Sequence, residues 1–351
     1  MLKLNTESHH LQIGGRKSKL AIMQSNIVKD VILEKFPNFE IDILALTTLG
    51  DQVLDKPLYS FGGKSLWTKE LEILLLQSIN EYPKLDLIVH SLKDMPTNLP
   101  SEFELGAILT REDPRDALIM KAGSPYKSLA ELPDGSIVGT SSVRRSAQLM
   151  KNHPNLRFES VRGNVQTRLD KLDDPQGQFS CLLLANAGLQ RLGLSHRITC
   201  LLDIPEMYYA VGQGALGVEI RSDDSFMKSI LEQIKDTETT YCCLAERSLM
   251  RFLEGGCSVP LGVNCKFNAE TKLLTLKSIV VSPDGKEYVE EEFSDVVCNN
   301  DDAEAIGITL GQKMLAKGAR EILEKIDHIN INEPPTTVFD GSSSVTPAIP
   351  Q

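Results

Sequence analysis

Short apolar runs alternate with segments of helical periodicity along most of the chain. Runs that predict strands cover residues 10–14, 40–48, 86–90, 105–109, 117–120, 136–139, 157–161, 181–185 and 216–220. Apolar residues at helical spacing predict helices over 18–35, 66–81, 142–152, 164–173, 186–193, 224–235 and 238–253. Because strands alternate with helices, the pattern predicts an α/β fold with mostly parallel sheets covered by helices.

The pattern changes from about residue 262. The residue pattern predicts strands over 263–267, 273–281 and 287–293, with a turn signal between the last two. Apolar residues at helical spacing predict a helix over 302–326. This combination predicts a small α+β domain with an antiparallel sheet. The proline- and serine-containing tail over 331–351 is expected to be disordered.

Length and charge narrow the class of protein. The 351 residues suit two or three domains, and 48 acidic against 37 basic side chains give a net charge of −11. This acidic balance disfavours a nucleic acid or an anionic membrane as partner. No apolar run reaches the roughly 18 residues of a membrane span, and the N-terminal residues lack the order of a secretory signal.

The seven cysteines indicate reduced thiols rather than a disulfide framework. Their number is odd and no CxxC occurs, which favours a cytosolic protein without a structural metal site. Cys257 differs from the others because two glycines precede it and Pro260 follows it. An exposed loop thiol is a candidate nucleophile or attachment point. From these residues alone, an inert loop cysteine is the simpler interpretation.

Arginine is concentrated in the middle of the chain, where nine of the 14 arginines lie between residues 101 and 200. Guanidinium groups pair with carboxylates or phosphates through two parallel hydrogen bonds. The distribution therefore suggests an anion site, although surface arginines paired with glutamates would give the same count.

Two strand-to-helix junctions give this anion site a location. Gly139 follows a predicted strand and precedes a helix, and Gly163 stands at a second junction of this kind. A helix start offers free N–H groups and the positive end of the helix dipole. Since both junctions belong to one domain, they are expected at the same edge of a parallel sheet. The polar side chains at the two junctions are Thr140, Ser141, Ser142, Arg144, Arg145, Arg162 and Arg168.

Two further polar clusters follow predicted strands. Arg16 and Ser18 stand between the first strand and the first helix, with Ser18 as the expected N-cap. Ser91, Lys93 and Asp94 follow the buried strand 86–90. A carboxylate beside an ammonium group there suits a charge stabiliser or a proton shuttle, and a salt-bridged loop aspartate fits equally well.

Two glycine motifs resemble nucleotide sites but lack their context. Gly212-Gln-Gly-Ala-Leu-Gly217 has the spacing of a dinucleotide fingerprint, yet a strand follows it where a helix is needed. Gly62-Gly-Lys-Ser65 has the end of a phosphate-binding loop, but Leu58 replaces the required first glycine. A nicotinamide dehydrogenase is therefore disfavoured.

Taken together, the motifs resemble the porphobilinogen deaminase family of tetrapyrrole biosynthesis. The resemblance covers residues 10 to 265 and departs from the family's usual residues at Gly15 and Trp67. The motifs occur in the family's order: Arg16-Lys-Ser-Lys-Leu-Ala21 with Gln24, Thr48-Leu-Gly-Asp51, Lys64-Ser-Leu-Trp-Thr-Lys-Glu-Leu-Glu72, His90-Ser-Leu-Lys-Asp-Met-Pro96, Asp113-Pro-Arg-Asp-Ala117, Gly139-Thr-Ser-Ser-Val-Arg-Arg145, Arg162-Gly-Asn164, Ala187-Gly-Leu-Gln-Arg191, Gly212-Gln-Gly214 and Gly255-Gly-Cys-Ser-Val-Pro260.

The resemblance implies three domains and a cytoplasmic, monomeric enzyme. Two lobes like those of periplasmic binding proteins, with mixed, mostly parallel sheets, would precede a small α+β domain. The implied limits are 1–112 with 213–234 for domain 1, 113–212 for domain 2 and 235–330 for domain 3. A two-lobed, non-catalytic anion-binding or solute-binding protein is the alternative, which the glycine-flanked Cys257 and the missing export signal disfavour.

The resemblance also implies an activity, in which four porphobilinogen molecules are joined with loss of ammonia and released as linear hydroxymethylbilane. Cys257 would carry a dipyrromethane cofactor through a thioether, and Asp94, with Lys93, would be catalytic. The other residues implied to bind the cofactor are Ser91, Thr140, Ser141, Ser142, Arg144, Arg145, Arg162 and Gly163. Those implied to bind the substrate are Arg16, Ser18, Gln24, Lys64, Trp67, Arg168 and Arg191.

Overall fold

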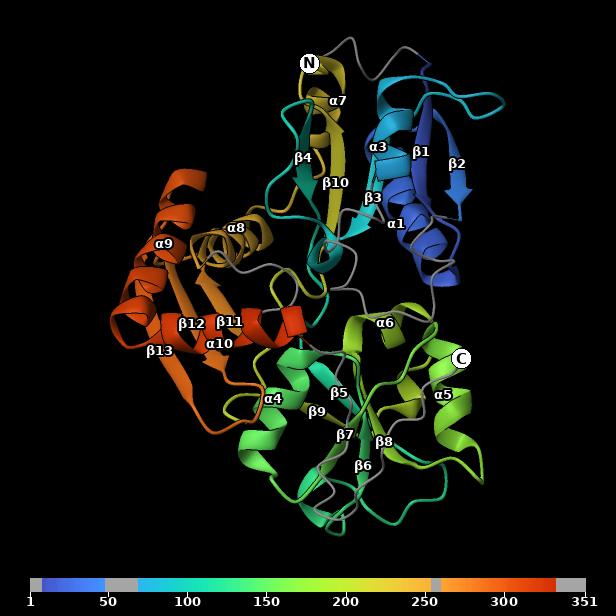
Figure 1. Cartoon of the computed structure of the whole chain (residues 1–351). Coiled ribbons are helices and arrows are strands. Elements are labelled where there is room, and N and C mark those ends of the chain that lie inside the picture. The colour runs from blue at the N-terminus through green and yellow to red at the C-terminus, as the bar shows by residue number, and fades with distance from the viewer. Residues whose placement is uncertain (1–7, 48–68, 254–259, 333–351) are drawn as a thin grey trace, which may run out of the picture.

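A computed structural model of the chain describes residues 8–47, 69–253 and 260–332. Within these residues the chain forms three bodies, each built on a sheet of its own (Figure 1). We refer to them in chain order as the first lobe, the second lobe and the third unit. No helix in the described ranges is long and apolar enough to cross a membrane.

The first lobe is built on a five-stranded mixed sheet of order β2-β1-β3-β10-β4. Strand β1 pairs in parallel with β2 and β3, whereas β10 runs antiparallel to β3 and β4. The strands are β1 (His10–Arg16), β2 (Glu40–Leu46), β3 (Leu87–Ser91), β4 (Phe103–Ile108) and β10 (Leu216–Arg221), and the helices are α1 (Lys19–Lys35), α3 (Lys69–Leu76) and α7 (Ser225–Leu231). Apolar residues of α1, such as Val28 and Ile32, form one core with the sheet.

The second lobe repeats this arrangement with a sheet of order β7-β6-β8-β5-β9. Strand β6 is parallel to β7 and β8, and β5 is antiparallel to β8 and β9. The strands are β5 (Asp116–Met120), β6 (Ile137–Gly139), β7 (Arg157–Glu159), β8 (Phe179–Ala185) and β9 (Cys200–Leu202), and the helices are α4 (Val143–Asn152), α5 (Val165–Asp173) and α6 (Asn186–Arg191).

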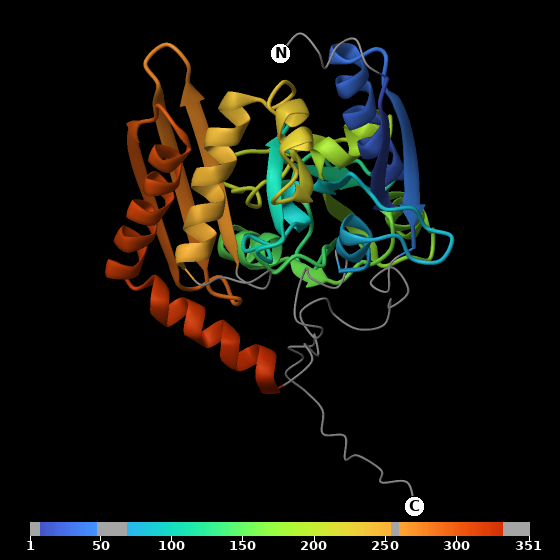
Figure 2. The ribbon, with the colours of Figure 1, turned by 90° about the horizontal axis from the view of Figure 1, so that it is seen from above.

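The third unit packs helices against an antiparallel sheet of order β11-β12-β13. Helices α8 and α9 lie against each other so closely that a Cβ atom on Gly307 would meet the Ala245 carbonyl oxygen at 2.2 Å. Figure 2 shows these elements on one flank of the molecule and α1, β1 and β2 on the opposite flank. The elements are α8 (Thr237–Phe252), β11 (Leu261–Asn268), β12 (Leu273–Val281), β13 (Tyr288–Val296), α9 (Asn300–Ala316) and α10 (Ala319–Asn332).

Two crossing segments join the lobes. The first, residues 109–115, leads from β4 to β5, and the second, residues 203–215, leads from β9 back to β10. The segments are bonded to each other, because the Glu112 N–H group donates to the Gly214 carbonyl oxygen at 3.3 Å. Gly214 has φ of +88°, and a Cβ atom there would lie 2.4 Å from the Glu112 carbonyl oxygen. Only glycine fits this position.

The predicted fold class is confirmed, with mixed sheets in the two lobes and an antiparallel sheet in the third unit. The prediction that these sheets are mostly parallel is wrong, because β10 and β5 run against their neighbours and make parallel and antiparallel pairings equally frequent in each lobe. The single helix predicted over 302–326 is wrong, since Gly318 with φ of +94° separates α9 from α10. The helix predicted to residue 81 ends at Leu76, because Asn80 adopts φ of +51° and the chain reverses.

Replacement of Gly214 by alanine tests the contact between the crossing segments. Gly214→Ala is expected to lower the free energy of unfolding by about 3 kcal/mol, because it adds a backbone clash to the strain of a positive φ. Gly135→Ala is the matched control, since Gly135 has φ of +80° and a Cβ atom there would meet no other atom within 4 Å, so it should cost about 1 kcal/mol. Urea unfolding measures both, and equal losses would contradict the close approach.

Candidate functional site

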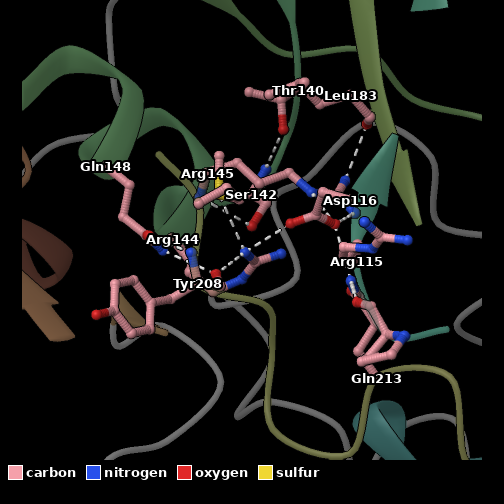
Figure 3. Close-up of polar contacts among 12 residues, drawn as sticks. Arg115, Asp116, Thr140, Ser142, Arg144, Arg145, Gln148, Leu183, Tyr208 and Gln213 are labelled. Carbon is pink, nitrogen blue, oxygen red and sulfur yellow. Dashed lines mark hydrogen bonds and ion pairs between the residues drawn. The ribbon is translucent and has the colours of Figure 1, made fainter. Parts of the chain in front are cut away.

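A buried carboxylate, Asp116, organises the junction between the lobes (Figure 3). It is the first residue of β5 and is fully buried. Arg144 Nη1 lies 2.7 Å from Asp116 Oδ2, and Arg145 Nη2 lies 2.7 Å from Asp116 Oδ1. Burial alone would raise the pKa of Asp116, but the two guanidinium groups outweigh it and hold the pKa well below its usual range.

The two arginines also donate to backbone carbonyl oxygens. Arg144 Nη1 donates to the Tyr208 oxygen at 2.5 Å, and Arg145 Nη1 donates to the Leu183 oxygen at 2.9 Å. Two guanidinium groups around one carboxylate leave one net positive charge. The pair was predicted to bind external anions with both charges, and the structure shows that Asp116 neutralises half of this charge inside the protein.

The two predicted strand-to-helix junctions lie side by side, as expected from the sequence. Strands β6 and β7 are parallel neighbours, and the Thr140 N–H group donates to the Glu159 carbonyl oxygen at 2.9 Å. The hydroxyl oxygens of Ser141 and Ser160 are 2.8 Å apart. Ser142 caps α4, and Asn164 caps α5.

Lys93 and Asp94 approach this edge from the first lobe. They belong to a single turn of 3₁₀ helix, Leu92–Asp94, directly after β3. Burial and the nearby Arg145 lower the pKa of Lys93 to about 8, although Asp94 and Asp116 act in the opposite direction. The protonation of Lys93 is therefore sensitive to nearby charges at a pH close to neutral.

Arg168, which lies on α5, is a further charged residue of this junction. Burial, together with Arg145 and Arg162, lowers its pKa to about 10, whereas Asp94 opposes this shift. Its Nε donates to the Gly163 carbonyl oxygen at 2.8 Å, across the tight turn where Gly163 has φ of +111°. Asp94 of the first lobe thus acts electrostatically on Arg168 of the second lobe.

Other predicted site residues lie at the ends of elements or tie neighbouring elements together. Ser18 caps α1, and Arg16 ends β1 beside it. Gln24 Nε2 donates to Ser91 Oγ at 2.7 Å, which ties α1 to the end of β3. Arg191 Nη2 donates to the Gly214 carbonyl oxygen at 2.7 Å, so this arginine lies against the second crossing segment. Three predicted site residues lie outside the described residues: Lys64, Trp67 and Cys257.

Some polar residues at the centre of the junction were not predicted as functional. Arg111 donates to both oxygens of Glu246 at 2.6 and 3.0 Å, and this glutamate of α8 is fully buried. The same glutamate accepts from the Gly212 N–H group at 2.8 Å. The third unit is thereby bonded to both crossing segments. In the sequence, Arg111 is marked only by the charged, proline-containing segment 111–115. Glu246 lies within a predicted helix, and nothing there indicates a functional role.

Removal of the central carboxylate is expected to destabilise the fold. Asp116→Asn leaves two buried guanidinium groups without their counter-ion and should lower the free energy of unfolding by about 3 kcal/mol at pH 7. Because the pKa of Asp116 is depressed in the folded state, this contribution is present above its ordinary value of 3.8 and disappears as the pH falls below it. Urea unfolding measures the loss, with exposed Asp134→Asn as the control. Equal stability of the two variants would contradict the central role of Asp116.

Family models match most of the chain. The model described as porphobilinogen deaminase, dipyromethane cofactor binding domain, matches residues 11–229. The model described as porphobilinogen deaminase, C-terminal domain, matches residues 240–316.

Curated relatives match along nearly their whole length. A porphobilinogen deaminase of Debaryomyces hansenii is 66% identical over 98% of this chain and 95% of its own. The corresponding protein of Saccharomyces cerevisiae is 58% identical over 90% of this chain and 97% of its own. Among solved structures, the methionine binding protein MetQ aligns with 68% of this chain and 94% of its own at 14% identity and a TM-score of 0.38.

Proposed function

This chain belongs to the porphobilinogen deaminase family of transferases, and we propose that it joins four porphobilinogen molecules in steps and releases linear hydroxymethylbilane. One observation carries the proposal. Asp94, the one carboxylate with a predicted catalytic role, ends the 3₁₀ turn Leu92–Asp94 next to Lys93, whose Nζ reaches Gln213 Oε1 of the second crossing segment at 3.5 Å. An acid placed beside basic groups suits a substrate that carries two carboxylates and reacts through a cation.

The junction has the chemistry needed to hold the family's dipyrromethane cofactor, whose acetate and propionate arms are anionic. Asp116, Arg144 and Arg145 together carry one net positive charge. In addition, Arg144 Nε and Arg191 Nε are buried donors without a hydrogen-bond partner among the described residues. The hydroxyl oxygens of Thr140 and Ser142 accept backbone N–H groups, which leaves their O–H groups free to donate. When bound, the cofactor supplies the pyrrole carbon to which the first substrate is joined.

We assign the acidic arms of cofactor and substrate to the basic and hydroxyl groups of both lobes. Arginine pairs with a carboxylate through two parallel hydrogen bonds, and burial strengthens such pairs. The cofactor-binding set is Ser91, Lys93, Asp94, Thr140, Ser141, Ser142, Arg144, Arg145, Arg162 and Gly163, with Cys257 as the point of attachment. The substrate-binding set is Arg16, Ser18, Gln24, Lys64, Trp67, Arg168 and Arg191.

Asp94 is proposed to stabilise positive charge and to move a proton. Loss of ammonia from porphobilinogen produces a cation, and a fixed carboxylate in a partly dry site stabilises such a charge without reorganisation. The same carboxylate can accept a hydrogen bond from a pyrrole N–H group and take up the proton that leaves after the new bond forms. Lys93 is proposed to assist by binding a carboxylate of the cofactor or substrate.

We further propose that the functional units follow the limits 1–112 with 213–234, 113–212 and 235–330, and that the enzyme is a cytoplasmic monomer. The bonds from Glu246 to Arg111 and Gly212 support a third unit that acts with both lobes. The described cysteines are free thiols, in keeping with a reducing compartment.

Intact mass spectrometry tests the covalent cofactor. The purified protein is expected to exceed its sequence mass by one dipyrromethane unit. Cys257→Ser should lose this increment and its activity, because the thioether cannot form. Cys298→Ser is the control, since Cys298 is exposed and outside the proposed site, and should keep the increment. An active protein without added mass would contradict the attachment.

Substitution of the proposed catalytic carboxylate tests the chemical role. Asp94→Asn keeps the size of the side chain and removes its charge, so kcat should fall at least about 100-fold while the mass increment remains. The rate of porphobilinogen consumption measures this effect, with the exposed Asp223→Asn of the same lobe as control. A rate within a few-fold of the unsubstituted protein would remove Asp94 from the mechanism.

A further inference from the structure

The side-chain amide of Gln213 links the two crossing segments. This residue of the second segment is 1% exposed. Its Nε2 donates to the Pro114 carbonyl oxygen at 2.6 Å and to Asp116 Oδ1 at 2.9 Å (Figure 3). A carbonyl oxygen and an ionised carboxylate can only accept, so both hydrogens of the amide are committed to these two partners.

The oxygen of the same amide is therefore turned toward the first lobe. Lys93 Nζ donates to Gln213 Oε1 at 3.5 Å, which is longer than a usual N–H···O hydrogen bond. The backbone of Gln213 is held as well, because Arg111 Nε donates to its carbonyl oxygen at 2.7 Å. The flanking Gly212 and Gly214 both have positive φ, which fixes the path of the chain on either side. The acceptor for Lys93 is thus built into the crossing segments.

We propose that Gln213 is a positioning residue, which holds the Lys93 ammonium group at the anion site. Its amide nitrogen is fixed by Pro114 and Asp116, and its amide oxygen accepts from Lys93. The inference rests on the proposed function, because it takes Lys93 as a ligand for an acidic arm of the substrate or cofactor. Gln213 acts through Lys93, and one rigid amide therefore sets the distance between the charge of the first lobe and the arginine pair of the second lobe.

The electrostatic surroundings of Lys93 make this role measurable. Burial and two positive neighbours favour its neutral form, two negative neighbours favour the ammonium ion, and the balance gives a pKa of about 8. A hydrogen bond accepted by Gln213 stabilises only the charged form, so its loss should lower this pKa further. Among the charged groups of the described residues, Asp94, Asp116, Arg144 and Arg145 act on Lys93.

Two substitutions should move the pH profile in opposite directions. Gln213→Leu removes the acceptor, so the basic limb of kcat/KM is expected to move down by about half to one pH unit, with a several-fold increase in KM. Gln213→Glu places a carboxylate beside Lys93, so the limb should move up. Gln233→Leu alters an exposed glutamine outside the site and should leave the profile unchanged.

If the basic limb of kcat/KM stays in place in folded Gln213 variants, the proposal is overturned, even if the rates fall. The reason is that a merely structural residue lowers activity without changing the pKa that the pH profile reports. Thermal unfolding shows which variants are folded, and Gln213→Asn adds a milder change that withdraws the oxygen by one methylene and should behave like leucine.

Lys93→Arg separates this test from the proposed function. Its guanidinium stays charged, so the basic limb should disappear, and a limb that persists would refute the role of Lys93 itself.

Discussion

The pairing of one buried carboxylate with two buried arginines is the interaction on which the rest of the structure depends. Asp116 begins the strand that enters the second lobe, and its partners Arg144 and Arg145 lie in the first turn of helix α4. An isolated ion buried there would carry a large desolvation penalty, so each charge requires the others. The start of β5, the start of α4 and the second crossing segment are consequently fixed relative to one another, and the anion site is assembled around them.

The arrangement of the lobes follows from features that the sequence displays. Apolar runs and helical spacing predicted most strands and helices of both lobes, because each of these elements buries a face that shows in its periodicity. They missed β9, whose three residues Cys200–Leu202 are too few to show a pattern, and they placed the end of α3 too late. The two glycine junctions at Gly139 and Gly163 were correctly expected to be neighbours, since parallel strands bring their ends to one edge. The break between α9 and α10 was missed because the apolar spacing continues on both sides of Gly318.

The inner partners of the site could not be predicted from local patterns. Nothing near Asp116 in the sequence indicates that it faces Arg144 and Arg145, which lie 28 and 29 positions away and reach it only through the sheet. The same holds for Arg111 and Glu246, which are 135 positions apart. Arginine density predicted an anion site but could not show that an internal carboxylate takes up part of that charge. Such pairings depend on the tertiary fold alone.

The double crossing between the lobes is a connection that allows a hinge-like rotation of one lobe against the other. Two segments bonded side by side, as at Glu112 and Gly214, define an axis, and a rotation displaces each atom in proportion to its distance from that axis. Gln213 and Asp116 lie at the crossing and would hardly move. Such a hinge can widen the outer part of the site for a lengthening product while its chemical centre keeps its geometry.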